Sequence, residues 1–201
     1  MVDASSSSDT RPSLLLRIRD PRDAAAWQTF VDVYAPLVYA HCRRKGLQEA
    51  DASDVTQEVL TEVAHSIAGF RYDPQRGRFR DWLGTLTRYR LAHFFGGRRP
   101  AAQGDERLEQ VPAPEADAEW TAEFHTRLLQ VALERARPHF EATTWRAFEL
   151  AWLEGRPAAD VADAVGLPIE KVYVAKSRAL KALREIILEL AEDLPLPGLG
   201  E

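Results

Sequence analysis

The side chains best suited to chemistry lie in one basic, aromatic stretch, residues 71–99. It holds eight arginines against two aspartates, a local charge of plus six in a 201-residue chain whose net charge is −5. Its aromatic residues are Tyr72, Phe79, Trp82, Tyr89, Phe94 and Phe95. Guanidinium groups bind phosphates and flat rings stack on unpaired bases, so the stretch predicts contact with single-stranded nucleic acid. An amphipathic helix with a solvated basic face is the plain alternative.

A turn and a helix must position these side chains. Asp73-Pro74 and Gly77 form turns, and a helical pattern runs from about Asp81 to Gly96-Gly97. The preceding helix, residues 50–70, has an apolar stripe at helical period. Its opposite flank carries four polar residues: Asp54, Gln57, Glu58 and Thr61. That flank is either a solvated face or a docking surface, because nothing around it indicates a pocket.

Composition limits the class of protein. Hydrophobic residues make up 45% and charged residues 28% of the chain, which is typical of a soluble globular protein. The single cysteine, Cys42, excludes an internal disulfide and fits a reducing compartment and a place in the core. No segment is long and apolar enough for a signal peptide or a membrane span, so we expect a cytoplasmic protein with no membrane partner. The sequence shows no histidines with metal-ligand spacing, no nucleophile and no phosphate-cradling loop. We therefore expect a protein that binds no metal and no cofactor and that is not an enzyme.

The N-terminal part predicts a disordered leader over residues 1–12 and a short helix over 13–19. Asp20-Pro21 then predicts a helix start, with Asp20 as the cap. That helix should reach about Lys45, and Pro36 predicts a kink or a break inside it. Residues 100–119 are acidic and contain three prolines, which favours a flexible linker.

The C-terminal part has the layout of a helix-turn-helix. After helices over about 120–140 and from Thr143 or Thr144 to Gly155, Pro157 starts a short helix, and Gly166-Leu167-Pro168 forms a tight turn. The next helix should bury Val172, Ala175, Ala179, Leu183 and Ile186. Residues 168–184 carry five bases and one acid, a charge that suits the major groove. A hairpin used only for packing is the alternative.

Together these segments identify a resemblance to a family. The chain resembles bacterial RNA polymerase sigma factors of the sigma-70 family, extracytoplasmic-function type. Residues 51–60 look like that family's polymerase-binding helix, and residues 78–99 like its promoter-melting and minus-ten segment. Residues 155–184 look like its minus-thirty-five reader. The chain departs from the family at Tyr89, where an Asn is common. The family usually has Lys-Ser-Arg early in the recognition helix, where this chain has Tyr-Val-Ala at 173–175. A Lys-Ser-Arg follows at 176–178.

The resemblance implies an all-α fold of two small helical domains joined by a flexible linker, the second a winged-helix-like helix-turn-helix. The implied segments are sigma region 2 at 13–99, a linker at 100–119, sigma region 4 at 120–190 and an acidic tail at 191–201. The implied partners are core RNA polymerase, duplex promoter DNA and its melted non-template strand. The resemblance also leaves an anti-sigma factor open as a partner.

The resemblance assigns roles residue by residue. Polymerase binding, at the clamp helices of the largest subunit, falls to Asp54, Gln57, Glu58 and Thr61. Minus-ten recognition and melting fall to Arg76, Arg78, Phe79, Arg80, Trp82, Arg88, Tyr89, Arg98 and Arg99, with Phe79 expected to touch an extruded base. The recognition helix contributes Lys171, Tyr173, Val174, Lys176, Ser177, Arg178 and Lys181.

The implied function is that of a sigma factor, which directs core polymerase to promoters and helps open the DNA. A helix-turn-helix regulator acting without polymerase is the main alternative, and its separate basic aromatic helix would then have no use. A single-strand or RNA-binding module would leave the helix-turn-helix unexplained.

Overall fold

The computed structural model describes residues 13–68, 79–96 and 117–191, and within those ranges all regular structure is helical. The elements are α1 (Leu14–Arg17), α2 (Ala24–Arg44), α3 (Glu49–Ser66), α4 (Phe79–Phe95), α5 (Ala118–Ala136), the short 3₁₀ turn η2 (Arg137–His139), α6 (Ala142–Phe148), the π-helical turn η3 (Glu149–Leu153), α7 (Ala158–Val165) and α8 (Ile169–Leu190). The all-α prediction is confirmed. In the described ranges, no helix combines the length and the apolar character that crossing a membrane requires.

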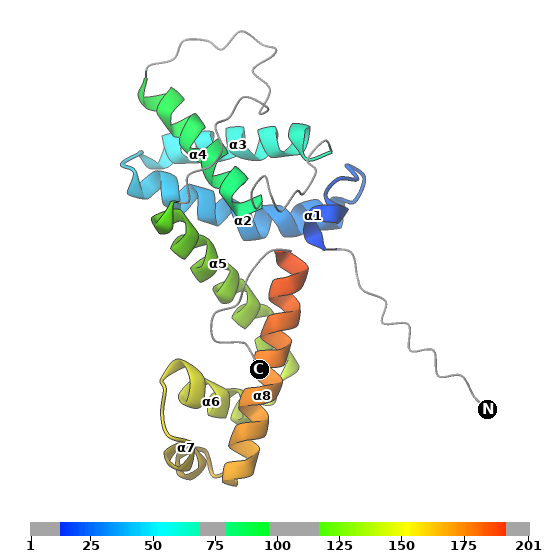
Figure 1. Cartoon of the computed structure of the whole chain (residues 1–201), viewed down its shortest axis with the longest axis vertical. Coiled ribbons are helices and arrows are strands. Elements are labelled where there is room, and N and C mark those ends of the chain that lie inside the picture. Colours follow the sequence, from blue (N-terminus) through cyan, green and yellow to red (C-terminus); the bar gives the residue numbers. More distant parts are fainter. Residues whose placement is uncertain (1–12, 69–78, 97–116, 192–201) are drawn as a thin grey trace, which may run out of the picture.

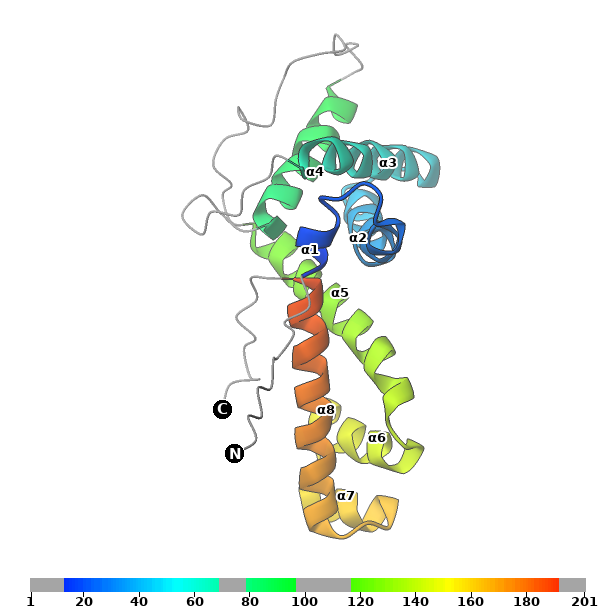
Figure 2. The ribbon, with the colours of Figure 1, turned by 90° about the vertical axis from the view of Figure 1, so that its right-hand side faces the viewer.

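The helices form two lobes. Helices α1–α4 make one lobe and α6–α7 the tip of the other, while α5 and α8 extend between them (Figures 1 and 2). The leader, the loop at 69–78, the linker up to residue 116 and the acidic tail from residue 192 lie outside the described residues.

Helix α2 begins later than the sequence predicted. Its N-cap is Asp23, not Asp20: the Asp23 carboxylate accepts a hydrogen bond from the Ala26 N–H at 2.9 Å. The same carboxylate accepts the Arg17 Nε–H at 3.0 Å, which ties α1 to the start of α2. Asp20 remains in the preceding turn. A carboxylate that both caps the helix and pairs with Arg17 lowers the free energy more than a cap alone.

Helix α2 continues through Pro36 as one element, so the predicted break does not form. Proline has no N–H, and the Asp32 carbonyl four residues earlier therefore loses its helical donor. Arg127 of α5 supplies replacements: its Nη2 lies 2.8 Å from the Asp32 oxygen and its Nε 3.2 Å from the Val33 oxygen. The position at which the helix was expected to be interrupted is thus where α5 docks on α2.

The first core is built from both ends of the described chain. The apolar faces of α1–α4 enclose it, and Trp120, Phe124 and Leu128 of α5 are buried in the same cluster together with Leu190 and Ala191 at the end of α8. The sequence had assigned these α5 residues to the second domain. The core boundary therefore falls within α5 and not at the linker.

The second lobe contains the helix-turn-helix. Gly166 has a φ of 68°, the left-handed conformation that glycine adopts without steric cost, and ends α7. Leu167 then packs into a small cluster that includes Val161 and Val172. The predicted buried stripe of α8 is confirmed except at its end, where Ile187 is buried and Ile186 is only partly covered.

Candidate nucleic-acid interface

The outer face of α3 displays the four polar residues that the sequence singled out. Asp54, Gln57, Glu58 and Thr61 are all exposed. The opposite face of the helix is buried in the first core through Val55, Val59 and Val63. The structure therefore brings the four side chains together on one accessible helical surface.

The far end of α4 displays aromatic rings. After Leu91, the last buried residue of the helix, Phe94 and Phe95 are exposed with their rings 5.5 Å apart, and Phe95 retains 60% of its accessible surface. Tyr89 is also exposed, and the Arg90 guanidinium lies 5.9 Å from its ring centre. Phe94 and Phe95 belong to the aromatic stretch that the sequence predicts to contact single-stranded nucleic acid, but the resemblance assigned them no individual role. Their position beyond the last buried residue of the helix was the signal that could have separated them from the aromatics of the core.

The arginines of α4 are held in ion pairs. Arg88 Nη1 lies 3.2 Å from Asp117 Oδ2, and Arg90 Nη2 lies 3.0 Å from Glu62 Oε2. Arg80 Nε lies 3.4 Å from Asp81 Oδ1, and Arg80 Nη1 is 3.0 Å from the His125 ring. A phosphate that approached Arg80 or Arg88 would therefore compete with these contacts.

Phe79 is buried, which corrects the expectation that its ring faces an extruded base. Its side chain is 1% exposed and packs edge-on against Phe30 and Tyr34 at centroid distances of 6.0 and 5.6 Å. The ring stands at the first position of α4, where it buries a large apolar surface in the first core. Trp82 is half-buried beside it, 5.4 Å away. Arg76, Arg78, Arg98 and Arg99 lie outside the described residues.

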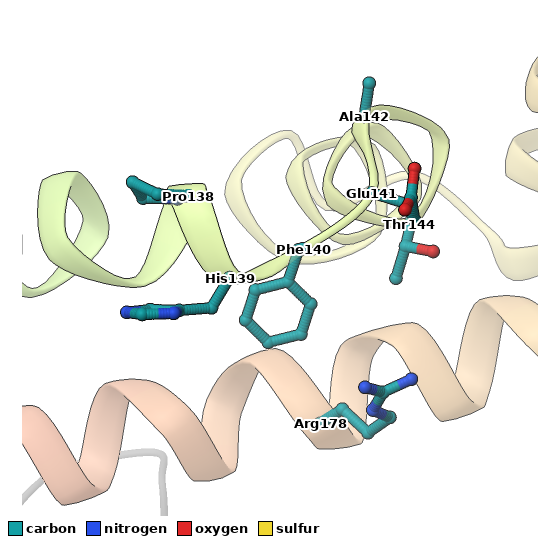
Figure 3. A pocket seen from close by; sticks show the side chains of 7 residues that line it. All are labelled: Pro138, His139, Phe140, Glu141, Ala142, Thr144 and Arg178. Atoms are coloured by element: carbon teal, nitrogen blue, oxygen red, sulfur yellow. The ribbon is translucent and has the colours of Figure 1, made fainter.

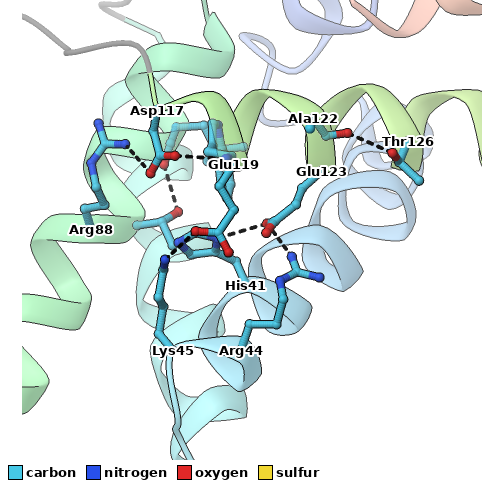
Figure 4. A network of polar contacts seen from close by, with 12 residues as sticks. His41, Arg44, Lys45, Arg88, Asp117, Glu119, Ala122, Glu123 and Thr126 are labelled. Carbon is cyan, nitrogen blue, oxygen red and sulfur yellow. Dashed lines mark hydrogen bonds and ion pairs between the residues drawn. The ribbon is translucent and has the colours of Figure 1, made fainter.

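A polar network joins α5 to the first lobe (Figure 4). Lys45 Nζ lies 2.7 Å from Glu119 Oε2, and this pairing raises the pKa of Lys45 and lowers that of Glu119. The fully buried His41 contacts Glu123 through Nδ1 at 2.9 Å, and Arg44 pairs with the same carboxylate. We call this contact surface between α5 and helices α2 and α4 the seam.

Trp120 lies at the centre of the seam. Its indole Nε1–H donates to the Arg80 carbonyl oxygen at 2.8 Å, and its ring meets the His41 ring edge-on at 5.1 Å. Gly84 of α4 lies against the same indole, where a methyl group would not fit. None of these seam contacts was predicted, because sequence periodicity does not show which face of α5 meets which lobe.

The recognition helix displays most of the residues assigned to it. Six of the seven are exposed: Lys171, Tyr173, Val174, Ser177, Arg178 and Lys181. Lys176 is half-buried. Within the described ranges, no group of three or more histidine, cysteine or acidic side chains is arranged to hold a metal ion.

The fold and these surfaces define an all-helical protein with a helix-turn-helix in one lobe and a cationic, aromatic helix in the other. Comparison with known proteins shows which proteins this chain is similar to. Residues 30–99 match the family model described as Sigma-70 region 2. The chain is 27% identical over 174 residues to the ECF RNA polymerase sigma factor SigE of Mycolicibacterium smegmatis, covering 84% of this chain and 64% of that protein.

A second relative is matched over nearly its whole length. The ECF RNA polymerase sigma factor RpoE of Cereibacter sphaeroides is 26% identical over 185 residues, which cover 92% of this chain and 98% of that protein. The solved structure of CnrH in complex with the cytosolic domain of CnrY aligns with 87% of this chain at 18% identity, covering 94% of the CnrH chain, with a TM-score of 0.36. Residues 30–99 of this chain thus match Sigma-70 region 2, and most of its length is similar to RNA polymerase sigma factors of the extracytoplasmic-function group. The resemblance noted from the sequence is confirmed.

Proposed function

We propose that this protein binds core RNA polymerase, directs it to specific promoters and helps to open the DNA, without bond chemistry of its own. One observation carries the proposal: three separate helices each display a surface suited to one of these tasks. They are the polar face of α3, the aromatic end of α4 and the cationic side of α8. The match of residues 30–99 to Sigma-70 region 2 and the similarity to extracytoplasmic-function sigma factors support it.

The exposed face of α3 is the polymerase-binding surface. Asp54 and Glu58 lie one helical turn apart with Gln57 between them, so their carboxylates form a compact acidic patch on a rigid support. Burial of Val55 and Val59 beneath the patch holds the helix in place. A preformed patch of this kind docks without the entropy cost of ordering a loop.

The aromatic end of α4 captures bases as the duplex opens. Each DNA stacking step is worth on average about 1.4 kcal/mol, while stacking of a base on an aromatic side chain returns about 1–3 kcal/mol. Tyr89, Phe94 and Phe95 together offer enough ring surface to offset the opening of one or two steps. Meanwhile α8 holds the upstream duplex through its cationic side and fixes the register of the complex.

The experiment is a reversal of charge on α3. Asp54→Arg with Glu58→Arg changes only exposed side chains, so the fold should persist by circular dichroism while co-purification with core polymerase is lost. Glu134→Arg with Asp163→Arg is the matched control, because it reverses two exposed acids on other helices by the same total charge. The control should bind core polymerase normally.

Two results would contradict the proposal. Normal core binding by the Asp54 and Glu58 variant would exclude α3 as the docking surface. Sequence-specific transcription control by that variant without any polymerase contact would favour the helix-turn-helix regulator instead. A separate reaction tests α4: Phe94→Ala with Phe95→Ala should fail on closed promoters and recover on a template with a pre-opened bubble, where no unstacking is required.

A further inference from the structure

The tip of the recognition helix is apolar at its centre. Tyr173 and Val174 are 60% and 49% exposed, and Ile169 in the first turn is also exposed. Their neighbours Val172 and Ala175 are buried against α6 and α7, so the helix cannot rotate to cover the exposed pair. The N-terminal residues of such a helix are the ones that contact base edges in the major groove.

Cations surround this apolar centre. At 100° per residue, Lys171 and Arg178 fall on one flank of α8, and Lys181 continues the line of Val174 two turns further on. Arg184 falls on the opposite flank, in line with Tyr173 but about three turns further along the helix. Glu170, in the first turn, is the one acid of the tip; it falls between the lines of Tyr173 and Val174, one turn before them, where a helix N-terminus favours negative charge. Cationic flanks around an apolar centre complement two phosphate backbones with a groove between them.

Arg178 is directed away from the centre of the tip. Its guanidinium lies 5.9 Å from the Phe140 ring centre, beside the turn that precedes α6. There it lines a cavity of about 380 Å³ together with His139 and Thr144 (Figure 3). Residues 169–177 contain no arginine, so the side chain that most often reads guanine is not available at the tip.

We propose that Val174 and Tyr173 read thymine C5-methyl groups in the major groove of the upstream promoter element. The thymine methyl is the apolar group that the base edges present in that groove, and apolar side chains discriminate through contact with it. This inference rests on the proposed function, in which α8 reads duplex DNA, and adds the class of base that the helix selects.

The experiment removes single methyl groups from the DNA. The full-length protein with core polymerase is first used to select upstream elements from a randomised duplex library. Each selected thymine is then replaced by deoxyuridine, which lacks only the C5-methyl. Loss of one buried methyl contact should weaken binding about fourfold at the thymines facing Val174 or Tyr173.

Side-chain variants then assign the contact. Val174→Ala should remove the sensitivity to deoxyuridine at one position, and Tyr173→Phe should retain it, because the ring and not the hydroxyl makes the contact. Leu188→Ala is the matched control, since Leu188 is an exposed apolar residue of the same helix far from its tip, and should leave the sensitivity unchanged.

The outcomes separate this inference from the proposed function. Thymine reading would be overturned if the protein shows a clear upstream preference but deoxyuridine has no effect. It would also be overturned if the effect of deoxyuridine persists in Val174→Ala and in Tyr173→Ala. In both cases α8 would remain a DNA reader. No upstream preference at all would overturn both. Unchanged DNA binding by Val174→Ala and Tyr173→Ala would likewise overturn thymine reading.

Discussion

Gly84→Ala should destabilise the protein although alanine has a higher helix propensity than glycine within α4. An ideal Cβ at Gly84 would lie 2.7 Å from both Cδ1 and Nε1 of Trp120 and 3.0 Å from Cε2. Trp120 is 1% exposed and bonded to the Arg80 carbonyl oxygen at 2.8 Å, so its ring can retreat only by breaking that hydrogen bond. Overpacking costs about 1–3 kcal/mol and the lost hydrogen bond about 0.5–1.5 kcal/mol, against a helix-propensity gain of about 1 kcal/mol. The net loss should be about 0.5–3.5 kcal/mol in the free energy of unfolding.

Urea unfolding followed by circular dichroism measures this loss. The Trp120→Ala background provides the control, because alanine lacks all three indole atoms that meet the new methyl group. In that background Gly84→Ala should stabilise α4 by about 0.5–1 kcal/mol, the propensity difference alone. A stabilising Gly84→Ala in the otherwise unchanged protein would show that the seam is not packed as described.

Three further predictions follow from buried or paired groups. Phe79→Ala should lower the free energy of unfolding by about 3–5 kcal/mol, and any soluble variant should transcribe equally poorly from duplex and bubble templates; recovery on the bubble would restore a base contact for Phe79. Burial raises the pKa of Asp117, but hydrogen bonds from the Trp120 N–H and Arg88 lower it by more, so its net pKa lies below the ordinary value. Its stabilisation should be complete above about pH 4 and lost as the pH falls further, and Asp117→Asn, which keeps the cap without the charge, should flatten that acid limb of stability; an unchanged limb would contradict the pairing. Burial raises the pKa of Cys42, the single cysteine, to about 11, so a thiol reagent should label it at mildly alkaline pH only after unfolding; rapid labelling of the folded protein would contradict its burial.

The helices were predictable because their signals are local. Apolar residues at helical spacing determined α2, α3 and α8, and Gly166 marked the turn of the helix-turn-helix. Of the kink or break predicted at Pro36, the sequence could not exclude the break, because the compensating donor, Arg127, lies more than ninety residues away. A local rule describes the cost of a proline but not the distant side chain that offsets it.

The exposed part of the site was more predictable than the buried part. The polar flank of α3 and the outer side of α8 follow directly from helical period. Phe79 could not be placed, because a ring at a helix start suits a base and a core equally well. The pairing of Arg88 with Asp117 depends on how α5 docks, which no pattern within either segment determines.

The bond from Tyr34 to α8 has a consequence for synthesis of the chain on the ribosome. The Tyr34 hydroxyl donates to the Leu190 carbonyl oxygen at 3.0 Å across a separation of 156 residues. At about 5–20 residues per second, roughly 8–30 seconds pass between the translation of these two residues. During that interval Phe30, Tyr34 and their neighbours lack the last side chains that cover them. The nascent first lobe therefore exposes apolar surface until residue 191 has left the exit tunnel, and chaperones have their opportunity to bind it in that interval.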